Sequence, residues 1–239
     1  MRIAVLSDIH GNLPALEKVF DDLRFTSPDL VVCAGDLVDY GPHPNEVVDF
    51  IRNVGIPCVM GNHDEAVGYE RRVEELKIAP GRDLRVEQAS FRWTVENVSE
   101  TNKNYLRILP FEFRPKEPFN DILIVHASPR SINEYLRFNT QPAIYREIAR
   151  SSLAKCIVFG HIHKTFIKSE AGVMFINVGS VGRPKDGSRK ATYLILDVDE
   201  EVTASYRRID YPVKATINDI KRSDLPDELA DDLWTGKSK

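Results

Sequence analysis

The 239-residue sequence has no long apolar run. No stretch approaches the roughly 20 apolar residues that a membrane-spanning helix needs. The short apolar run at residues 2–7 leads into Asp8 and His10, which is not the pattern of a signal peptide. We therefore expect a cytoplasmic protein that makes no membrane contact.

Cysteine pairs and a surplus of positive charge are also missing. Cys33, Cys58 and Cys156 each lie inside an apolar run and form no CxxC pair, which argues against a disulfide framework or a zinc knuckle and favours buried thiols. The net charge of -4 argues against general nucleic-acid binding, although it does not exclude a local basic patch. The length suits one domain with one substantial core, at residues 1–239.

The first sixty residues alternate between two kinds of pattern. Apolar runs at 2–7, 29–34 and 56–60 predict strands, and apolar residues at helical spacing between them, at 13–23 and 47–51, predict helices. Strands that alternate with helices in this way predict βαβ units and a parallel sheet.

The rest of the chain has a different character. An apolar pattern at 84–98 predicts an amphipathic helix within a charged insertion at about 64–109, which could lie over the site as a cap. A helix is expected near 141–150, and one or two polar helices in the tail at 212–239. Short strands are expected at 111–115, 121–126, 156–159, 165–168, 173–177, 191–197 and 202–208.

Polar side chains follow the expected strands at the point where each strand ends. The carboxyl ends of strands in an open α/β sheet form the crevice where ligands bind, so these side chains should converge. One such residue alone is usually a hydrogen-bonded structural group or a helix cap, whereas repetition after several strands indicates a shared site. The set is Asp8, His10, Asp36, Asn62, His63, His126, His161 and His163.

Carboxylate, amide and imidazole groups in this number exceed what one metal ion needs. They suit Mn²⁺, Fe²⁺ or Zn²⁺. Two ions about 3.5–4 Å apart that share a bridging carboxylate would use the whole set, clamp the oxygens of an in-line displacement at phosphorus and lower the pKa of a bound water. We expect two divalent ions, Mn²⁺ first, with Fe²⁺, Zn²⁺, Ni²⁺ or Co²⁺ as alternatives.

Five sequence blocks resemble the calcineurin-like metallophosphoesterase superfamily, and the resemblance runs from residue 1 to about residue 210. The loops at 40–42 and 179–184 are similar to those of small YfcE-type phosphodiesterases and the diadenosine tetraphosphatase-like group. The resemblance implies an α/β fold, a four-layer α/β/β/α sandwich of two mixed sheets flanked by helices. The blocks are Asp8-Ile9-His10, Gly35-Asp36-Leu37-Val38-Asp39, Gly61-Asn62-His63-Asp64, His126 and Gly160-His161-Ile162-His163.

The same resemblance implies a role for each polar residue of these blocks. Three residues would hold the first metal, three would hold the second, and one carboxylate would bridge them. In that order, they are Asp8, His10 and His163, then Asn62, His126 and His161, and the bridging Asp36.

Four further residues are candidates for contact with substrate or for catalysis. His63 would contact the phosphate and protonate the leaving oxygen, with Asp64 orienting its ring. Tyr40 and Arg183 are candidate substrate contacts, because an arginine can hold phosphate oxygens in a bidentate way. The alternative for Arg183 is a solvated hairpin loop.

Two departures from well-known relatives narrow the expected chemistry. Phosphoprotein phosphatases of the superfamily carry Asp-Arg-Gly where this chain has Asp39-Tyr40-Gly41, which favours a phosphodiesterase over a protein phosphatase. Purple acid phosphatases place a tyrosine ligand three residues after the bridging aspartate, where this chain has Asp39. Two divalent ions are therefore favoured over an Fe³⁺–tyrosinate site.

We expect hydrolysis of a phosphodiester or phosphoanhydride bond in a small phosphorylated, nucleotide-like substrate by metal-activated water. Two alternatives are left open. One is a catalytically silent metal-binding scaffold that acts through a partner. The other is a nuclease, which the acidic charge balance disfavours.

Overall fold

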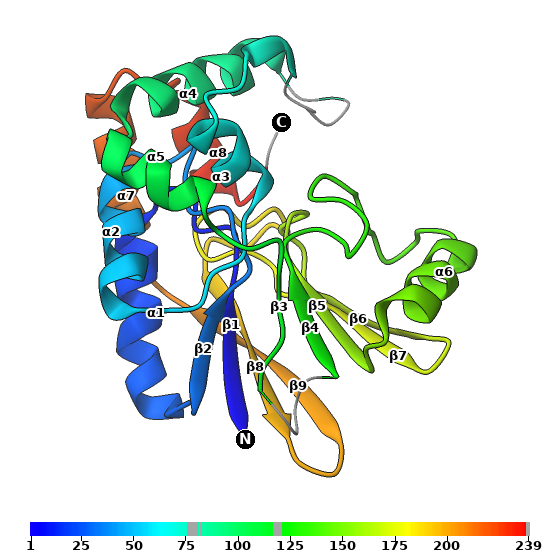
Figure 1. Cartoon of the computed structure of the whole chain (residues 1–239). Helices are drawn as coiled ribbons and strands as arrows, with labels where there is room; N and C mark the ends of the chain where they lie inside the picture. The colour runs from blue at the N-terminus through cyan, green and yellow to red at the C-terminus, as the bar shows by residue number, and fades with distance from the viewer. Residues whose placement is uncertain (76–80, 82, 117–120, 238–239) are drawn as a thin grey trace.

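Two β-sheets pack face to face, and helices cover both outer faces (Figure 1). The computed structural model describes residues 1–75, 81, 83–116 and 121–237. The four-layer α/β/β/α expectation is confirmed. None of the described helices is long and apolar enough to cross a membrane.

The first sheet has the strand order β2-β1-β8-β9. β1 pairs in parallel with β2 and antiparallel with β8, and β8 and β9 form an antiparallel hairpin. The sheet is therefore mixed, with its parallel βαβ unit on one side. The strands are β1 (Arg2–Leu6), β2 (Leu30–Cys33), β8 (Ala191–Val198) and β9 (Val202–Ile209), each within one residue of its predicted bounds.

The second sheet has the order β3-β4-β5-β7-β6. β4, β5 and β7 are parallel, whereas β3 and β6 pair antiparallel at the two edges. This sheet confirms the short strands expected after residue 111. Its strands are β3 (Glu112–Phe113), β4 (Ile122–Val125), β5 (Cys156–Phe159), β6 (Phe166–Glu170) and β7 (Val173–Asn177).

The strand predicted at 56–60 is wrong. This segment makes a single parallel bridge, Cys33 to Cys58, beside β2. Pro57 has no N–H to donate to a ladder, and the N–H of Met60 donates to the carbonyl of Pro110 instead, at 2.7 Å. The prediction that the cysteines are buried thiols is confirmed.

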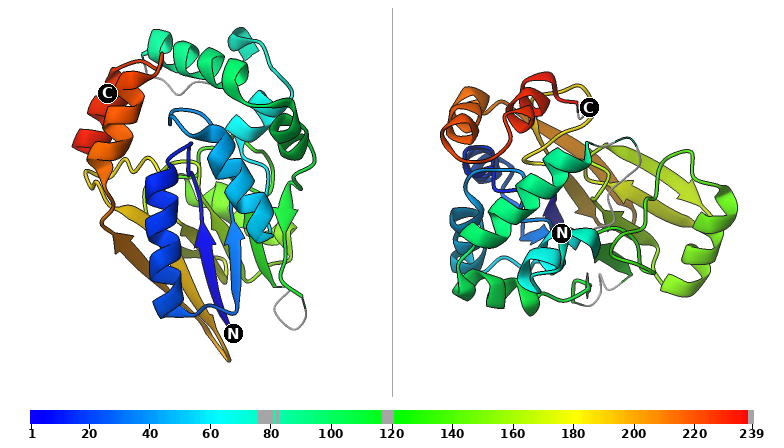
Figure 2. Two further views of the ribbon diagram at one scale, coloured as in Figure 1. Left: turned by 90° about the vertical axis from the view of Figure 1, so that its left-hand side faces the viewer. Right: turned by 90° about the horizontal axis from the view of Figure 1, so that it is seen from above.

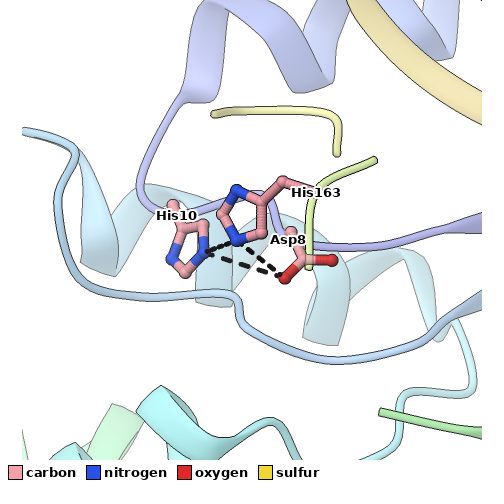
Figure 3. A group of neighbouring side chains, drawn as sticks. All are labelled: Asp8, His10 and His163. Carbon is pink, nitrogen blue, oxygen red and sulfur yellow. Dashed lines mark hydrogen bonds and ion pairs between the residues drawn. The ribbon is translucent and has the colours of Figure 1, made fainter. Parts of the chain in front are cut away.

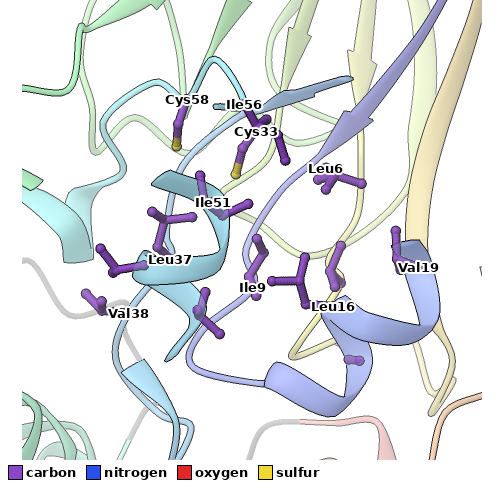
Figure 4. Packing of buried hydrophobic residues seen from close by; sticks show 14 of the residues in the cluster. Leu6, Ile9, Leu16, Val19, Cys33, Leu37, Val38, Ile51, Ile56 and Cys58 are labelled. Carbon is purple, nitrogen blue, oxygen red and sulfur yellow. The ribbon is translucent and has the colours of Figure 1, made fainter. Parts of the chain in front are cut away.

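The alternation of side chains along the strands divides the apolar core into layers. On β1, Leu6 faces α1 (Leu13–Thr26) and α2 (Pro44–Val54), and Val5 faces the second sheet. On β4, Ile124 faces the first sheet and Val125 faces α6 (Pro142–Ser152). Figure 4 shows the outer layer, where Leu6, Ile9 and Leu16 of α1 belong to one cluster of buried side chains. Period-two burial on both sheets thus produces the four layers.

A group of helices gathers above the carboxyl ends of the strands (Figures 1 and 2). Apolar side chains from α4, α7 and α8 pack there around Tyr40. The helices predicted at 84–98 and in the tail are confirmed, whereas closure of the 64–109 insertion over the site stays a prediction. The group comprises α3 (Asn62–Gly68), the short helix η1 (Val73–Glu75), α4 (Leu84–Asn97), α5 (Glu100–Arg107), α7 (Val213–Arg222) and α8 (Glu228–Thr235).

Candidate metal centre

The seven expected ligands meet beyond the carboxyl ends of the strands. They follow β1, β2, β4 and β5 or lie in the first turn of α3. All except Asn62 are buried. The residues that the structure brings together are Asp8, His10, Asp36, Asn62, His126, His161 and His163.

Asp8, His10 and His163 form the first group of potential ligands (Figure 3). His163 Nε2 lies 3.2 Å from Asp8 Oδ1 and 3.2 Å from His10 Nε2. One carboxylate oxygen and two imidazole nitrogens therefore point at a common space. This donor set suits a divalent ion of the Mn²⁺-to-Zn²⁺ type.

Asp36, His126 and His161 form the second group. His126 Nε2 lies 3.3 Å from Asp36 Oδ2 and 2.9 Å from Asn62 Oδ1. The amide oxygen of Asn62 thus joins the two imidazoles and the carboxylate. The structure brings together the same second set that the sequence resemblance implies.

Asp36 lies between the two groups. Its Oδ2 is 3.7 Å from His10 Nε2 of the first group and 3.3 Å from His126 Nε2 of the second. One carboxylate oxygen therefore faces an imidazole from each side, which is the arrangement that a bridging ligand requires.

Hydrogen bonds orient the imidazoles toward the centre. Three of the rings hold a backbone carbonyl at Nδ1, so that a donating Nδ1–H leaves the lone pair of Nε2 for a metal. The Nε2 of His161 is buried and has no hydrogen-bond partner in the described part of the chain. Metal coordination would satisfy that atom, so the residues present fit divalent ions. The oriented pairs are His10–Val38 (2.9 Å), His126–Ala34 (2.8 Å) and His163–Arg183 (2.5 Å).

Burial and charge set the protonation of these rings. Burial lowers the pKa of His10 and of His163 well below the usual value, and burial together with the charge of His126 lowers the pKa of His161 to about 3. Burial also acts against protonation of His126, but the Asp36 carboxylate outweighs it and raises the pKa of His126 to about 10. Three neutral imidazoles are thus available as ligands. Without a metal, the fourth, His126, takes up a proton that pairs with the Asp36 carboxylate.

The backbone turns sharply at the centre. Several of its non-glycine residues have φ in the left-handed region, which costs roughly 1–3 kcal/mol for each such residue. These turns direct polar side chains inward directly after the strands end. They are Asp8 (54°), His10 (50°), Asp36 (56°), Asp39 (72°), Tyr40 (64°), His161 (67°) and His163 (57°).

His63 lies beside the metal ligands, and its ring is held by Asp39. Nδ1 of His63 is 2.8 Å from Asp39 Oδ2. Burial acts to lower the pKa of His63, but the charges of Asp36 and Asp39 outweigh it and raise the pKa. The two carboxylates therefore favour the protonated ring, which donates hydrogen bonds from both nitrogens.

The expectation that Asp64 orients His63 is wrong. Asp64 is the third residue of α3, and its carboxylate accepts backbone N–H groups from the residue before that helix and from the loop after β2. Burial and the nearby charge of Asp36 raise the pKa of Asp64 to about 6. Its donors are the N–H groups of Asp36 (2.8 Å), Leu37 (2.8 Å) and Gly61 (2.9 Å).

Helix α4 supplies a set of contacts that the sequence did not indicate. Asp39 Oδ1 accepts hydrogen bonds from Ser90 Oγ (2.5 Å) and Thr94 Oγ1 (3.3 Å). The Tyr40 hydroxyl donates to Glu87 Oε2 at 2.5 Å. Glu87, Ser90 and Thr94 are buried on one face of α4, and with Asp39 and Tyr40 we call them the α4 wall. Buried polar residues at i, i+3 and i+7 of an amphipathic helix were the available signal.

Tyr40 and Arg183 occupy different positions relative to the open site. Tyr40 lines the large pocket, and its hydroxyl is 3.4 Å from His63 Nε2. Arg183 lies behind Tyr40, with Cζ 3.7 Å from the centroid of that ring, and pairs with Asp232 at 2.8 Å. Its side chain is only 4% exposed and does not line the pocket. The expectation that Arg183 contacts substrate directly is therefore contradicted by its stacking and burial.

The centre opens into a pocket of about 1240 Å³. Asp36, Asn62, His161 and His163 lie at its base, and the α4 wall contributes one side. Residues of the segments 133–139 and 164–166 form another part of the lining, which we call the distal wall. A reacting phosphate at the base would leave space for a much larger group.

Comparisons with known proteins agree with this geometry. The family model described as the calcineurin-like phosphoesterase superfamily domain matches residues 1–201. An uncharacterized protein of Methanocaldococcus jannaschii is 30% identical over 98% of each chain. The crystal structure of a metallophosphoesterase from Sphaerobacter thermophilus is 28% identical with a TM-score of 0.78, covering 99% of this chain and 100% of that one. A hypothetical protein from Pyrococcus horikoshii OT3 shares the fold at 22% identity, with a TM-score of 0.87 over 100% of this chain and 99% of the other.

Proposed function

The chain belongs to the calcineurin-like phosphoesterase superfamily, and we propose that it hydrolyses a phosphodiester or phosphoanhydride bond in a small, nucleotide-like substrate. The observation that carries this proposal is the pair of ligand groups joined by Asp36, whose Oδ2 faces both His10 and His126. Two divalent ions are proposed as cofactors, with Mn²⁺ as the first candidate.

The two ligand groups would each hold one ion. Asp8, His10 and His163 would hold one ion, and Asn62, His126 and His161 the other, with Asp36 shared. Bound there, the ions would supply positive charge to the phosphate oxygens and lower the pKa of an attacking water. The carbonyl contacts at Nδ1 keep the imidazoles oriented, so little reorganisation is needed when ions bind.

His63 is proposed to act on the substrate itself. Its Nδ1 is tied to Asp39, which leaves Nε2 directed at the pocket beside the Tyr40 hydroxyl. From this position the ring would donate a hydrogen bond to a phosphate oxygen and protonate the leaving oxygen. Asp39 would keep the ring in the orientation that this step requires.

A panel of substrates and metals tests the proposed function. The protein is freed of metal with a chelator, reloaded with Mn²⁺, Fe²⁺, Zn²⁺, Ni²⁺ or Co²⁺, and assayed on bis-p-nitrophenyl phosphate, p-nitrophenyl phosphate, diadenosine tetraphosphate and 2′,3′-cyclic nucleotides. We expect no turnover without metal, restored turnover with it, and a preference for the diester over the monoester. Binding of two ions with no turnover of any substrate would instead indicate a silent scaffold.

Two variants separate the ligands from His63 in the same assay. Asp36→Asn should lose nearly all activity and bind less metal, because both groups lose their common carboxylate. His63→Ala should keep both ions and turn over about 10²–10⁴-fold more slowly. Loss of both ions in His63→Ala, measured by elemental analysis, would contradict the role of His63 as a non-ligand.

A further inference from the structure

We propose that the distal wall binds a second phosphate and the base of the substrate, so that the leaving group is itself a nucleoside phosphate. This inference rests on the proposed function, since the reacting phosphate is assigned to the metal centre. The observations behind it are the size of the pocket, the pairing of its charged groups and an exposed aromatic ring.

The pocket is larger than the reacting phosphate needs. Its volume of about 1240 Å³ exceeds the roughly 300–1,000 Å³ typical of sites for drug-sized ligands. Among the expected metal ligands, only Asp36, Asn62, His161 and His163 line it, and most of its lining comes from other residues. A substrate that fills this space carries a substantial group beyond the scissile bond.

The carboxylates that line the pocket outside the metal centre already have partners. Their charges are therefore offset by the chain itself, and they do not call for a cationic ligand. The ion pairs are Glu65–Arg71 (2.5 Å), Glu75–Arg72 (2.7 Å), Asp186–Arg208 (2.7 Å), Asp39–His63 (2.8 Å) and Glu87–Arg183 (4.0 Å).

Two cations on the distal wall are different. Arg137 and Lys164 are exposed, line the pocket and form no ion pair with any residue that the structure describes. In a chain of net charge -4, two cations left without carboxylates beside a phosphate-hydrolysing centre indicate an anionic ligand. The planar fork of Arg137 suits a phosphate group in particular.

Aromatic rings connect the metal centre to these cations. The ring of Tyr135 lies 4.3 Å from that of His161, and the guanidinium of Arg137 lies 5.0 Å from the Tyr135 centroid. Phe138, next along the chain, is 61% exposed and contacts Phe166 edge-on at 6.0 Å. An exposed ring on the wall of a pocket offers a face on which a nucleobase can stack.

The backbone of the distal wall is held in place. The carbonyl of Arg137 accepts a hydrogen bond from the Tyr145 hydroxyl at 2.9 Å, and its N–H donates to Thr140 Oγ1 at 2.9 Å. Lys168 Nζ donates to the Phe138 carbonyl at 3.0 Å. The side chains of Arg137 and Phe138 therefore project from an ordered support, which reduces the entropy lost when a ligand binds.

Inhibition by simple nucleotides tests the assignment. Hydrolysis of bis-p-nitrophenyl phosphate by the Mn²⁺-loaded protein is measured with phosphate, AMP and ADP as competitors, in wild type, Arg137→Met and Phe138→Ala. Arg150→Met, an exposed arginine of α6 outside the pocket, is the matched control. We expect ADP to compete best, and Arg137→Met to weaken ADP about tenfold more than it weakens phosphate.

Two other outcomes of these measurements would contradict the proposal. Equal losses for ADP and phosphate in Arg137→Met, or no difference between Phe138→Ala and wild type for AMP, would overturn the assignment of the distal wall. If the wild-type protein hydrolyses nothing, calorimetric titration of ADP into the Mn²⁺-loaded wild-type and Arg137→Met proteins still decides the point. If wild type binds ADP more tightly than Arg137→Met but hydrolyses nothing, the proposed function is refuted and the assignment of the distal wall stands.

Discussion

The two sides of the pocket treat polar groups in opposite ways. On the α4 wall, Asp39, Tyr40, Glu87 and Ser90 are buried and bonded to one another. On the distal wall, the cations are exposed and have no carboxylate partner among the described residues. A closed network fixes the positions of the protein's own groups, whereas an unmatched charge is available to a ligand.

This difference assigns separate tasks to the two walls. The α4 wall contacts the ring of His63 through the Asp39 carboxylate, so it should determine the rate of the chemical step. The distal wall meets the metal centre at the ring of Tyr135, which lies 4.3 Å from that of His161, and itself supplies no metal ligand, so it should determine which substrate binds. Variants on each wall can break or sharpen this division.

The largest effect is expected from Asp39→Asn. The amide that replaces the carboxylate no longer offers His63 a negative charge, and both the ring orientation and its proton affinity should suffer. We expect kcat to fall roughly 10²-fold or more while both ions stay bound, as measured by steady-state kinetics and elemental analysis. Asp199→Asn, on the exposed turn after β8, is the control, and an unchanged kcat in Asp39→Asn would remove the α4 wall from catalysis.

A smaller effect on rate, with a clear effect on stability, is expected from Ser90→Ala. The change removes a 2.5 Å hydrogen bond to a buried carboxylate oxygen. The free energy of unfolding should fall by about 1–3 kcal/mol, and kcat should fall several-fold with metals retained. Urea unfolding compared with Ser151→Ala on the exposed face of α6 measures this, and equal stability of the two variants would show that the network is not cooperative.

The smallest effect on stability is expected on the distal wall. Arg137→Met and Lys164→Met remove charges that have no ion pair in the described structure. The free energy of unfolding should stay within about 0.5 kcal/mol of wild type in urea titrations. A loss above about 1 kcal/mol would mean that these cations support the fold and are not reserved for a ligand.

The sequence predicted the parts of the molecule that depend on periodicity and on strand ends. Short continuous apolar runs predicted the bounds of β5 and β7, which are buried on both faces. Polar residues after the strands predicted the ligands, because parallel strands end at one edge of a sheet. Both patterns lie among residues that are close together in the chain, so they can be recognised without knowledge of the tertiary structure.

The parts that could not be predicted depend on which of two similar groups is nearer in space. Asp64 is adjacent to His63 in sequence, but its helix turns its carboxylate toward the backbone, and Asp39 reaches the ring from another loop. Arg183 follows a strand like the ligands do, yet Asp232 of α8 and the ring of Tyr40 hold it away from the pocket. Such choices are made by long-range packing, which no local pattern records.

The left-handed turns at the metal centre also bear on how the site is inherited. Glycine adopts such turns without penalty, whereas aspartate and histidine do so at a cost. A lineage selected only for folding would relieve this strain by replacing His161, whose buried Nε2 has no hydrogen-bond partner in the described part of the chain, with glycine. That ligating side chains occupy these turns instead indicates selection acting on the site itself, against the direction in which foldability alone would drive the sequence.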